Sequence, residues 1–226
     1  NDFLKAGSDC VETDTFGIMP HVLSEFDLGD RSFELAKKAA EIARACCDEH
    51  STDDKPRFAI GTLGPGTKLL TLGQIEWPEM YESYKTAAAG LIAGGADALL
   101  AETCQDLLQV KCCVNGCLAA IEEAGLTPDD MPILVSVTIE QMGTMLVGSS
   151  IEAALVALRE YPIASLGINC ATGPTEMAEY VEYLGKNWER TVSVWPNAGL
   201  PVLVEGRTEY PLGPEPFAEA MVKFVE

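Results

Sequence analysis

The sequence predicts an α/β fold of the (β/α)8 barrel type, incomplete within these 226 residues. Apolar runs typical of buried parallel strands alternate with amphipathic helical segments, which indicates right-handed βαβ units. About six of the eight units of a complete barrel are visible. Polar side chains follow strands along the whole chain, which favours a barrel over an open doubly wound sheet, where a site gathers at one switch point.

The N-terminal residues read as the end of a helix, without an initiator Met. Residues 9–15 (DCVETDT) are predicted as a strand that ends in polar residues. Residues 32–49 show the spacing of an amphipathic helix, with Ser32 as its expected N-cap. The intervening loop, 17–30, is rich in Gly and Pro. We expect the chain to be part of a longer protein, with the first and last barrel strands outside it.

The second predicted unit begins with a strand at 57–62, which leads into a Gly-Pro-Gly turn. A helix is expected over 79–94, and the paired glycines Gly94-Gly95 set its end. The apolar run ADALLAET predicts the next strand at 96–103. No GxGxxG motif follows the first strand, which speaks against dinucleotide binding.

The middle of the chain continues the alternation. A helix is expected over 107–124, with Gly125 as its stop. The run PILVSVTI predicts a strand at 132–139, and a serine-capped helix follows at 150–160.

The last predicted units contain the most informative strand. Residues 163–170 (IASLGINC) form an apolar run that ends at Asn169-Cys170, and a helix is expected over 175–185. A further strand at 191–195 ends in Pro196-Asn197-Ala198-Gly199. A last helix begins at about 215, after a long loop at 199–214.

Composition excludes several classes of function. The net charge is −20, from 15 basic and 35 acidic residues, so a nucleic acid is a poor partner. There is no apolar run of 18 residues, and we expect no signal peptide, since the first residues lack a basic region followed by an apolar stretch. Eight cysteines without a secretory signal indicate a reducing, cytoplasmic compartment.

Cys170 is the foremost candidate for chemistry, because ligands and catalysis lie at the C-terminal ends of parallel strands. The alternative is that Cys170 is a small core residue, as many free cysteines are. The adjacent pairs Cys46-Cys47 and Cys112-Cys113 lie in helical patterns. With Cys117, they are assigned to core packing rather than to metal binding.

Other polar side chains at strand ends are candidate ligands. Glu102 ends an apolar strand, where a carboxylate either binds a cation or is a solvated loop residue. The ligand role is favoured, with a substrate ammonium group as the expected partner. Turn or capping roles remain open for the Asp and Asn residues. The candidate substrate-binding residues are Glu102, Asp14, Thr15, Asn169, Asn197 and Thr138.

Neither histidine has the spacing of a catalytic pair or of an HExxH metal site. His50 reads as a solvated helix cap, and His21 as part of a mobile loop. A Ser-His-Asp hydrolase is therefore not expected.

Five motifs together resemble the homocysteine S-methyltransferase domain family. They are ETDTFG (12–17), GADALLAETCQD (95–106), GTMLVGS (143–149), GINCATGP (167–174) and PNAGLP (196–201). The resemblance covers essentially the whole chain and is greatest to the homocysteine-binding module of cobalamin-dependent methionine synthases. It implies a TIM-type barrel that forms a single domain over 1–226.

The resemblance also implies a zinc ion held by three cysteines. Cys170 matches the family's strand-end cysteine, so it is the expected metal ligand and catalytic residue. The other two cysteines form a glycine-flanked pair in the family, which we expect beyond residue 226. Glu102 would hold the homocysteine amino group, with Asn169 and Asn197 in the same pocket. Asp14 stands where the family usually has Asn.

The resemblance implies zinc-dependent methyl transfer to L-homocysteine, giving methionine. Methylcobalamin would be the donor and methyltetrahydrofolate its upstream source, both carried by cobalamin-binding and folate-binding modules of a longer chain. One alternative is a stand-alone homocysteine methyltransferase that uses betaine, S-methylmethionine or S-adenosylmethionine. Another is an inactive truncated barrel without zinc, since one cysteine ligand is too few for tight binding.

Overall fold

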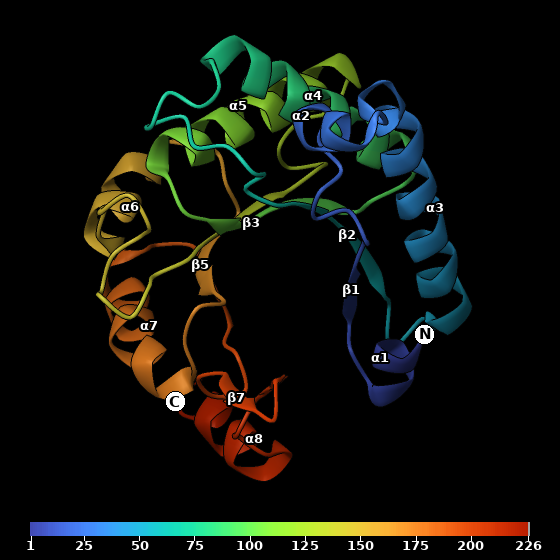
Figure 1. The fold of residues 1–226 in the computed structure, drawn as a ribbon. Helices are drawn as coiled ribbons and strands as arrows, with labels where there is room; N and C mark the ends of the chain where they lie inside the picture. The colour runs from blue at the N-terminus through green and yellow to red at the C-terminus, as the bar shows by residue number, and fades with distance from the viewer. Residues whose placement is uncertain (226) are drawn as a thin grey trace. The chain divides into compact units, whose positions relative to one another are not determined.

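The computed structural model describes residues 1–225 and contains a sheet of six parallel strands. They follow one another in chain order, with one or more helices between consecutive strands (Figure 1). This arrangement confirms the predicted succession of β/α units. The strands are β1 (Cys10–Glu12), β2 (Phe58–Leu63), β3 (Ala98–Cys104), β4 (Ile133–Val137), β5 (Ser165–Asn169) and β6 (Thr191–Trp195).

The helices are α1 (Asp2–Ala6), α2 (Pro20–Leu23), α3 (Ser32–His50), α4 (Trp77–Ala93), α5 (Leu107–Glu123), α6 (Ile151–Leu158), α7 (Pro174–Asn187) and α8 (Pro214–Val222). The predicted helices, α3 to α8, agree with the sequence pattern to within a few residues, whereas α2 was not predicted. Within residues 1–225, none of the helices has both the length and the hydropathy needed to cross a lipid bilayer.

The chain divides into two compact units. The first unit comprises Asn1–Glu102 and Leu108–Leu134, and the second comprises Thr103–Leu107 and Val135–Glu226. Each unit has its own buried side chains and its own candidate residues.

The first unit is built from β1, β2, most of β3 and the helices α1 to α5. Leu4, Ala43, Cys47 and Ala59 form one core cluster, which ties α1 and α3 to β2. The α3 and α4 helices pack closely because Gly90 of α4 and Gly94, directly after α4, face α3. A Cβ atom on Gly94 would lie 2.3 Å from the carbonyl oxygen of Lys37, so this crossing requires glycine.

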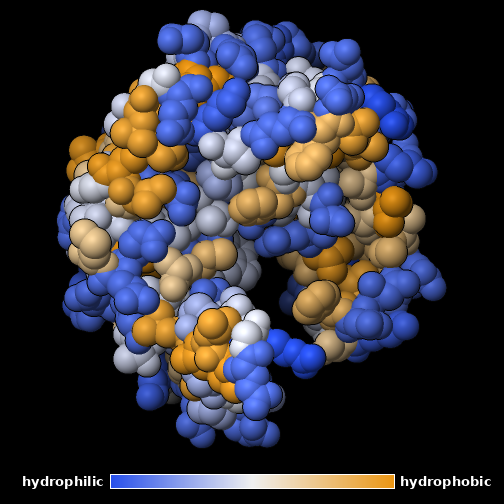
Figure 2. All heavy atoms as spheres, viewed as in Figure 1, coloured by the Kyte–Doolittle hydropathy of each residue, from blue (hydrophilic) through white to orange (hydrophobic). Residues whose placement is uncertain are grey.

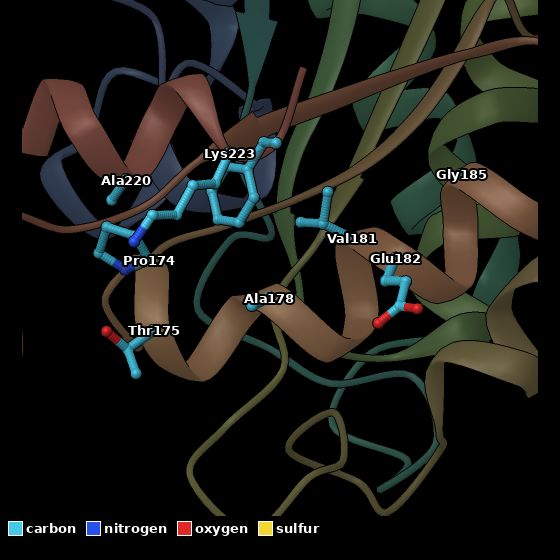
Figure 3. A pocket seen from close by; sticks show the side chains of 9 residues that line it. Pro174, Thr175, Ala178, Val181, Glu182, Gly185, Ala220 and Lys223 are labelled. Atoms are coloured by element: carbon cyan, nitrogen blue, oxygen red, sulfur yellow. The ribbon is translucent and has the colours of Figure 1, made fainter. Parts of the chain in front are cut away.

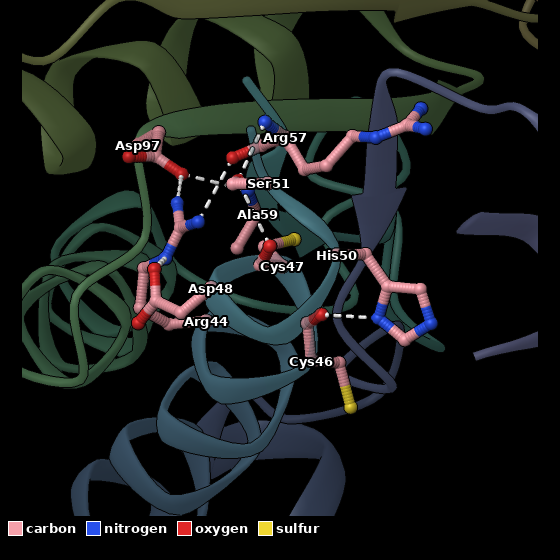
Figure 4. A network of polar contacts seen from close by, with 9 residues as sticks. All are labelled: Arg44, Cys46, Cys47, Asp48, His50, Ser51, Arg57, Ala59 and Asp97. Atoms are coloured by element: carbon pink, nitrogen blue, oxygen red, sulfur yellow. Dashed lines mark hydrogen bonds and ion pairs between the residues drawn. The ribbon is translucent and has the colours of Figure 1, made fainter. Parts of the chain in front are cut away.

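A polar network joins α3 of this unit to the beginnings of β2 and β3 (Figure 4). Arg44 pairs with Asp97, and its Nη2 donates to the carbonyl oxygen of Arg57 at 2.8 Å. Asp97 also accepts the backbone N–H of Ala59 at 2.7 Å. Because these contacts lie at the N-terminal ends of the strands, they support stability rather than catalysis.

The second unit is built around β5 and β6, which pair in parallel from Ser165–Thr191 to Asn169–Trp195. All five residues of β5 are buried, as expected for a parallel strand covered on both faces. Ser150 caps α6 as predicted, since its side chain accepts the N–H of Ala153.

The loop predicted at 199–214 instead contains a hairpin of β7 (Val202–Val204) and β8 (Arg207–Glu209). Figure 2 shows hydrophobic side chains on the surface over β7 and α8. They include Val202, Leu203 and Val222.

Two expectations for the first unit were wrong. Ser32 is the first residue of α3 and not its N-cap, because its hydroxyl donates to the carbonyl oxygen of Ile18 at 2.6 Å. The segment 17–30 is not a loop throughout, since it holds α2 and two short 3-10 helices, Ser24–Phe26 and Gly29–Arg31. His21 therefore belongs to a helix and is only 5% exposed.

Candidate functional site

Cys170 follows the last residue of β5 in the second unit, at the strand end where the sequence places it. Its φ of 61° lies in the left-handed region, which is uncommon for a residue other than glycine. The N–H of Cys170 donates to the carbonyl oxygen of Trp195 at 3.1 Å, which holds the turn against the end of β6. The side chain remains partly exposed, so the thiol is not a core residue.

The Asn169 side chain is the centre of a buried hydrogen-bond network that reaches this thiol. Its Oδ1 accepts the N–H of Thr103 at 3.1 Å and the hydroxyl of Ser136 at 2.7 Å. Its Nδ2 donates to Thr103 Oγ1 at 2.8 Å and to Cys170 Sγ at 3.2 Å. Two donors on the oxygen leave one orientation for the amide, so the nitrogen must face the sulfur. We call Thr103, Ser136, Asn169 and Cys170 the Asn169 network.

Thr138 supports the backbone beside this network. Its hydroxyl donates to the carbonyl oxygen of Asn169 at 3.1 Å, and its N–H donates to the carbonyl oxygen of Cys104 at 2.9 Å. The side chain is 2% exposed. The structure therefore gives Thr138 an internal role, and its predicted contact with substrate stays a prediction.

Asn197 lies close to the same turn, through backbone contacts. Its N–H donates to the carbonyl oxygen of Thr172 at 3.0 Å, and the N–H of Thr172 donates to the carbonyl oxygen of Cys170 at 2.6 Å. The backbone of Asn197 therefore lies near the turn that follows Asn169 and Cys170, and its predicted contact with substrate stays a prediction.

Glu102 of the first unit lies in β3 and is half-buried. Burial, as the larger cause, and the nearby charge of Glu12 together raise the pKa of its carboxyl to about 7. A hydrogen bond with Thr62 acts in the opposite direction. A carboxyl group in such surroundings is suited to bind a cation, because an ammonium ion would stabilise its charged form.

Thr15 and Asp14, the two candidates that follow β1, differ in their surroundings. Thr15 is buried, and its hydroxyl donates to the carbonyl oxygen of Thr62 at 2.7 Å. The Thr15 hydroxyl also lies 2.5 Å from the hydroxyl of Thr13. Asp14 is exposed and lines a cavity of about 520 Å³ between β1, α1 and α3, together with Glu12.

Sequence reasoning missed Ser136. It lies in β4 two residues before Thr138, and side chains two apart point to the same face of a strand. The available signal was a second hydroxyl in the predicted strand 132–139, on the same face as Thr138.

A second cavity, of about 510 Å³, lies between α7 and α8 of the second unit (Figure 3). It is lined by small and apolar side chains together with Glu182 and Lys223. None of the predicted site residues lines it, so its size alone does not mark it as functional.

The described residues do not form a zinc site. Zinc in proteins takes four ligands, and Cys170 is the one thiol of the Asn169 network. Within residues 1–225, no group of three His, Cys, Asp or Glu side chains could hold a metal ion. The pairs Cys46-Cys47 and Cys112-Cys113 lie on α3 and α5, as predicted, and three of the four are buried.

Comparison with known proteins identifies the family. The profile of the family described as homocysteine S-methyltransferase matches residues 1–226. The chain belongs to this family. This membership confirms the resemblance carried by the five motifs.

Two curated relatives of this chain are named methionine synthase and come from mycobacteria. The Mycobacterium tuberculosis protein is 46% identical over 224 residues, which are 99% of this chain and 18% of that protein. The Mycobacterium leprae protein is 46% identical over 223 residues, with the same coverage. The chain thus spans 18% of the length of these curated relatives.

Solved structures of the family confirm the predicted TIM-type barrel fold. The metallated form of the homocysteine methyltransferase MmuM from Escherichia coli superposes with a TM-score of 0.73 at 18% identity. This match covers 88% of the chain and 70% of MmuM. The apo form of MmuM gives a TM-score of 0.59 at 20% identity, over 88% of the chain and 69% of MmuM.

Proposed function

We propose that this chain is the homocysteine-accepting part of an enzyme that transfers a methyl group to L-homocysteine and so makes methionine. The observation that carries the proposal is the placement of Cys170 at the end of β5, with its sulfur held by the Asn169 amide. Membership of the homocysteine S-methyltransferase family and 46% identity to methionine synthases support it. In the reaction, the sulfur–methyl bond forms as the donor–methyl bond breaks, and the substrate loses its thiol proton.

We assign the two ends of homocysteine to different residues. Glu102 binds the ammonium group. Burial disfavours the ionised form of its carboxyl, and a positively charged partner would stabilise that form. Cys170 is the catalytic residue at the sulfur end, with Asn169 and Asn197 beside it. Asp14, Thr15 and Thr138 complete the proposed substrate pocket as supporting residues.

Zinc and cobalamin belong to the proposal for the longer protein. Cys170 would be one zinc ligand, and further cysteines outside residues 1–226 would complete the site. When bound, the metal would hold the substrate sulfur as a thiolate. Methylcobalamin is the proposed donor, because relatives 46% identical are methionine synthases. Cobalamin-binding and folate-binding modules, a single barrel domain and a cytoplasmic location are part of the same proposal.

The deciding experiment uses the full-length protein that contains this chain. Consumption of methylcobalamin is followed with L-homocysteine as acceptor, in the wild type and in Cys170→Ala. We expect Cys170→Ala to lose turnover by at least about a thousandfold. The matched control is Cys46→Ala, which removes a helix cysteine away from the strand ends and should retain activity.

Retained turnover in Cys170→Ala would contradict the proposed role. Turnover with betaine, S-methylmethionine or S-adenosylmethionine, but not with methylcobalamin, would instead support the stand-alone class of donor.

A further inference from the structure

We propose that Thr103 is a positioning residue for Cys170, and that its hydroxyl donates a hydrogen bond to the cysteine sulfur. The inference rests on the proposed function in one respect, because that function requires the sulfur of Cys170 to be held in a fixed position. Thr103 Oγ1 lies 3.8 Å from Cys170 Sγ, within the range of hydrogen bonds to sulfur.

The direction of this hydrogen bond follows from the Asn169 network. Thr103 Oγ1 already accepts a proton from Asn169 Nδ2 at 2.8 Å. A hydroxyl has a single proton, and that proton remains free to point away from the amide. The sulfur is an acceptor within reach of it. When the sulfur is a thiolate it has no proton, so Thr103 must be the donor.

The sulfur therefore faces two donors in a fixed arrangement. Asn169 Nδ2 supplies one N–H at 3.2 Å, and Thr103 supplies the hydroxyl. The amide is held by two contacts to its oxygen, from Ser136 and from the backbone of Thr103. The two contacts together fix the position of the sulfur at the end of β5.

The backbone of Thr103 supports this interpretation. Its φ is 54°, a left-handed conformation that is a true outlier for a β-branched residue. Such a conformation costs about 1–3 kcal/mol and persists only where surrounding contacts impose it. Here the N–H of Thr103 is fixed by Asn169 Oδ1, and the hydroxyl of the same residue lies toward Cys170 Sγ.

The test compares two substitutions at one position in the purified 226-residue chain. Thr103→Val keeps the branched shape and removes the donor, whereas Thr103→Ser keeps the donor. Ser165→Ala is the control, because Ser165 is a buried hydroxyl of β5 that contacts Ser193 and lies outside the network. Circular dichroism verifies that each variant is folded at the pH of the assay.

The measurement is the rate at which iodoacetamide alkylates Cys170, followed by mass spectrometry of its peptide. It is made at an alkaline pH where cysteine thiols are ionised, so that the rate reports hydrogen bonding to the sulfur. A thiolate that loses a donor is a stronger nucleophile. We expect Thr103→Val to react about three- to tenfold faster, and Thr103→Ser and Ser165→Ala to stay within about twofold of the wild type.

An unchanged or slower rate in Thr103→Val would overturn the proposal, as would equal acceleration in Thr103→Ser. The outcome is independent of the proposed function, because alkylation requires neither homocysteine nor a methyl donor. If Cys170→Ala of the full-length protein keeps its turnover while Thr103→Val still reacts faster, the proposed function fails and the hydrogen bond stands.

Discussion

The charge of Glu12 raises the pKa of Glu102, although the two residues lie on β1 and β3, with β2 between these strands. Partial burial also raises the pKa of Glu12 itself. The first unit therefore brings two carboxyl groups close enough to influence one another. Such a pair favours a bound cation over two separate charges.

The first prediction concerns this pair. Glu12→Gln should lower the pKa of Glu102, because it removes the neighbouring negative charge. The pKa should remain above the usual 4.5, since burial is the larger cause of the shift. Carboxyl-carbon NMR titration of the purified chain measures it. Glu122→Gln, on the exposed side of α5, is the control and should leave the pKa of Glu102 unchanged.

The second prediction concerns the stability of Glu102→Gln as pH changes. The pKa of Glu102 is about 7 in the folded chain and 4.5 in the usual unfolded reference. Between these values the folded state binds more protons, so the wild-type free energy of unfolding falls as pH rises through about 7. Glutamine does not ionise and escapes this loss.

Glu102→Gln should therefore gain stability relative to the wild type as pH rises from 4.5 to above 7. The gain is about 1 kcal/mol, after allowance for the solvent that still reaches this half-buried carboxyl. Urea unfolding at several pH values measures the difference. A difference that stays constant with pH would show that Glu102 keeps an ordinary pKa.

The site residues that directly follow or end a strand could be predicted from the sequence. Cys170 and Asn169 end an apolar run, and parallel strands place such residues at the functional edge. The contact of Asn169 with Thr103 could not be predicted, because the two are 66 residues apart. It also depends on positive φ angles at Thr103 and Cys170, which no residue preference indicates.

The fold, too, could be predicted in part from the sequence. The strand Thr191–Trp195 was predicted with its observed bounds, because a β-branched run stands directly before a proline. The capping role of Ser32 was not realised, because Ile18 offers its hydroxyl a tertiary acceptor. Local preference therefore located the elements, while long-range hydrogen bonds decided what individual hydroxyl groups do.

The third prediction concerns Tyr84, which is fully buried on α4. Its hydroxyl donates to the carbonyl oxygen of Gly64 at 2.9 Å and accepts from Gln109 Nε2 at 2.8 Å. Tyr84→Phe removes the hydroxyl to which both the Gly64 carbonyl oxygen and the Gln109 amide are hydrogen-bonded in the interior. We expect a loss of about 1–3 kcal/mol in the free energy of unfolding. Tyr81→Phe is the matched control, since Tyr81 is only partly buried on the same helix and should change stability little.

The fourth prediction uses two glycines that share a left-handed backbone. Gly66 has a φ of +74°, and a Cβ atom there would lie 2.4 Å from His21 Nε2. Gly73 has a φ of +66°, and a Cβ atom there would meet nothing within 4 Å. Alanine should therefore cost about 1 kcal/mol at Gly73, from backbone strain alone. It should cost about 2 kcal/mol more at Gly66, where the added carbon overpacks the interior.

His21 cannot yield easily to a new side chain at Gly66. Its Nδ1 lies 2.7 Å from the hydroxyl of Ser83, and burial, with the charge of Lys68, lowers the pKa of His21 to about 4. The ring is therefore neutral and fixed at neutral pH. Urea unfolding of Gly66→Ala in the wild type and in His21→Ala measures the clash. In the second background the cost should fall to that of Gly73→Ala, and an undiminished cost would show that backbone strain explains Gly66 by itself.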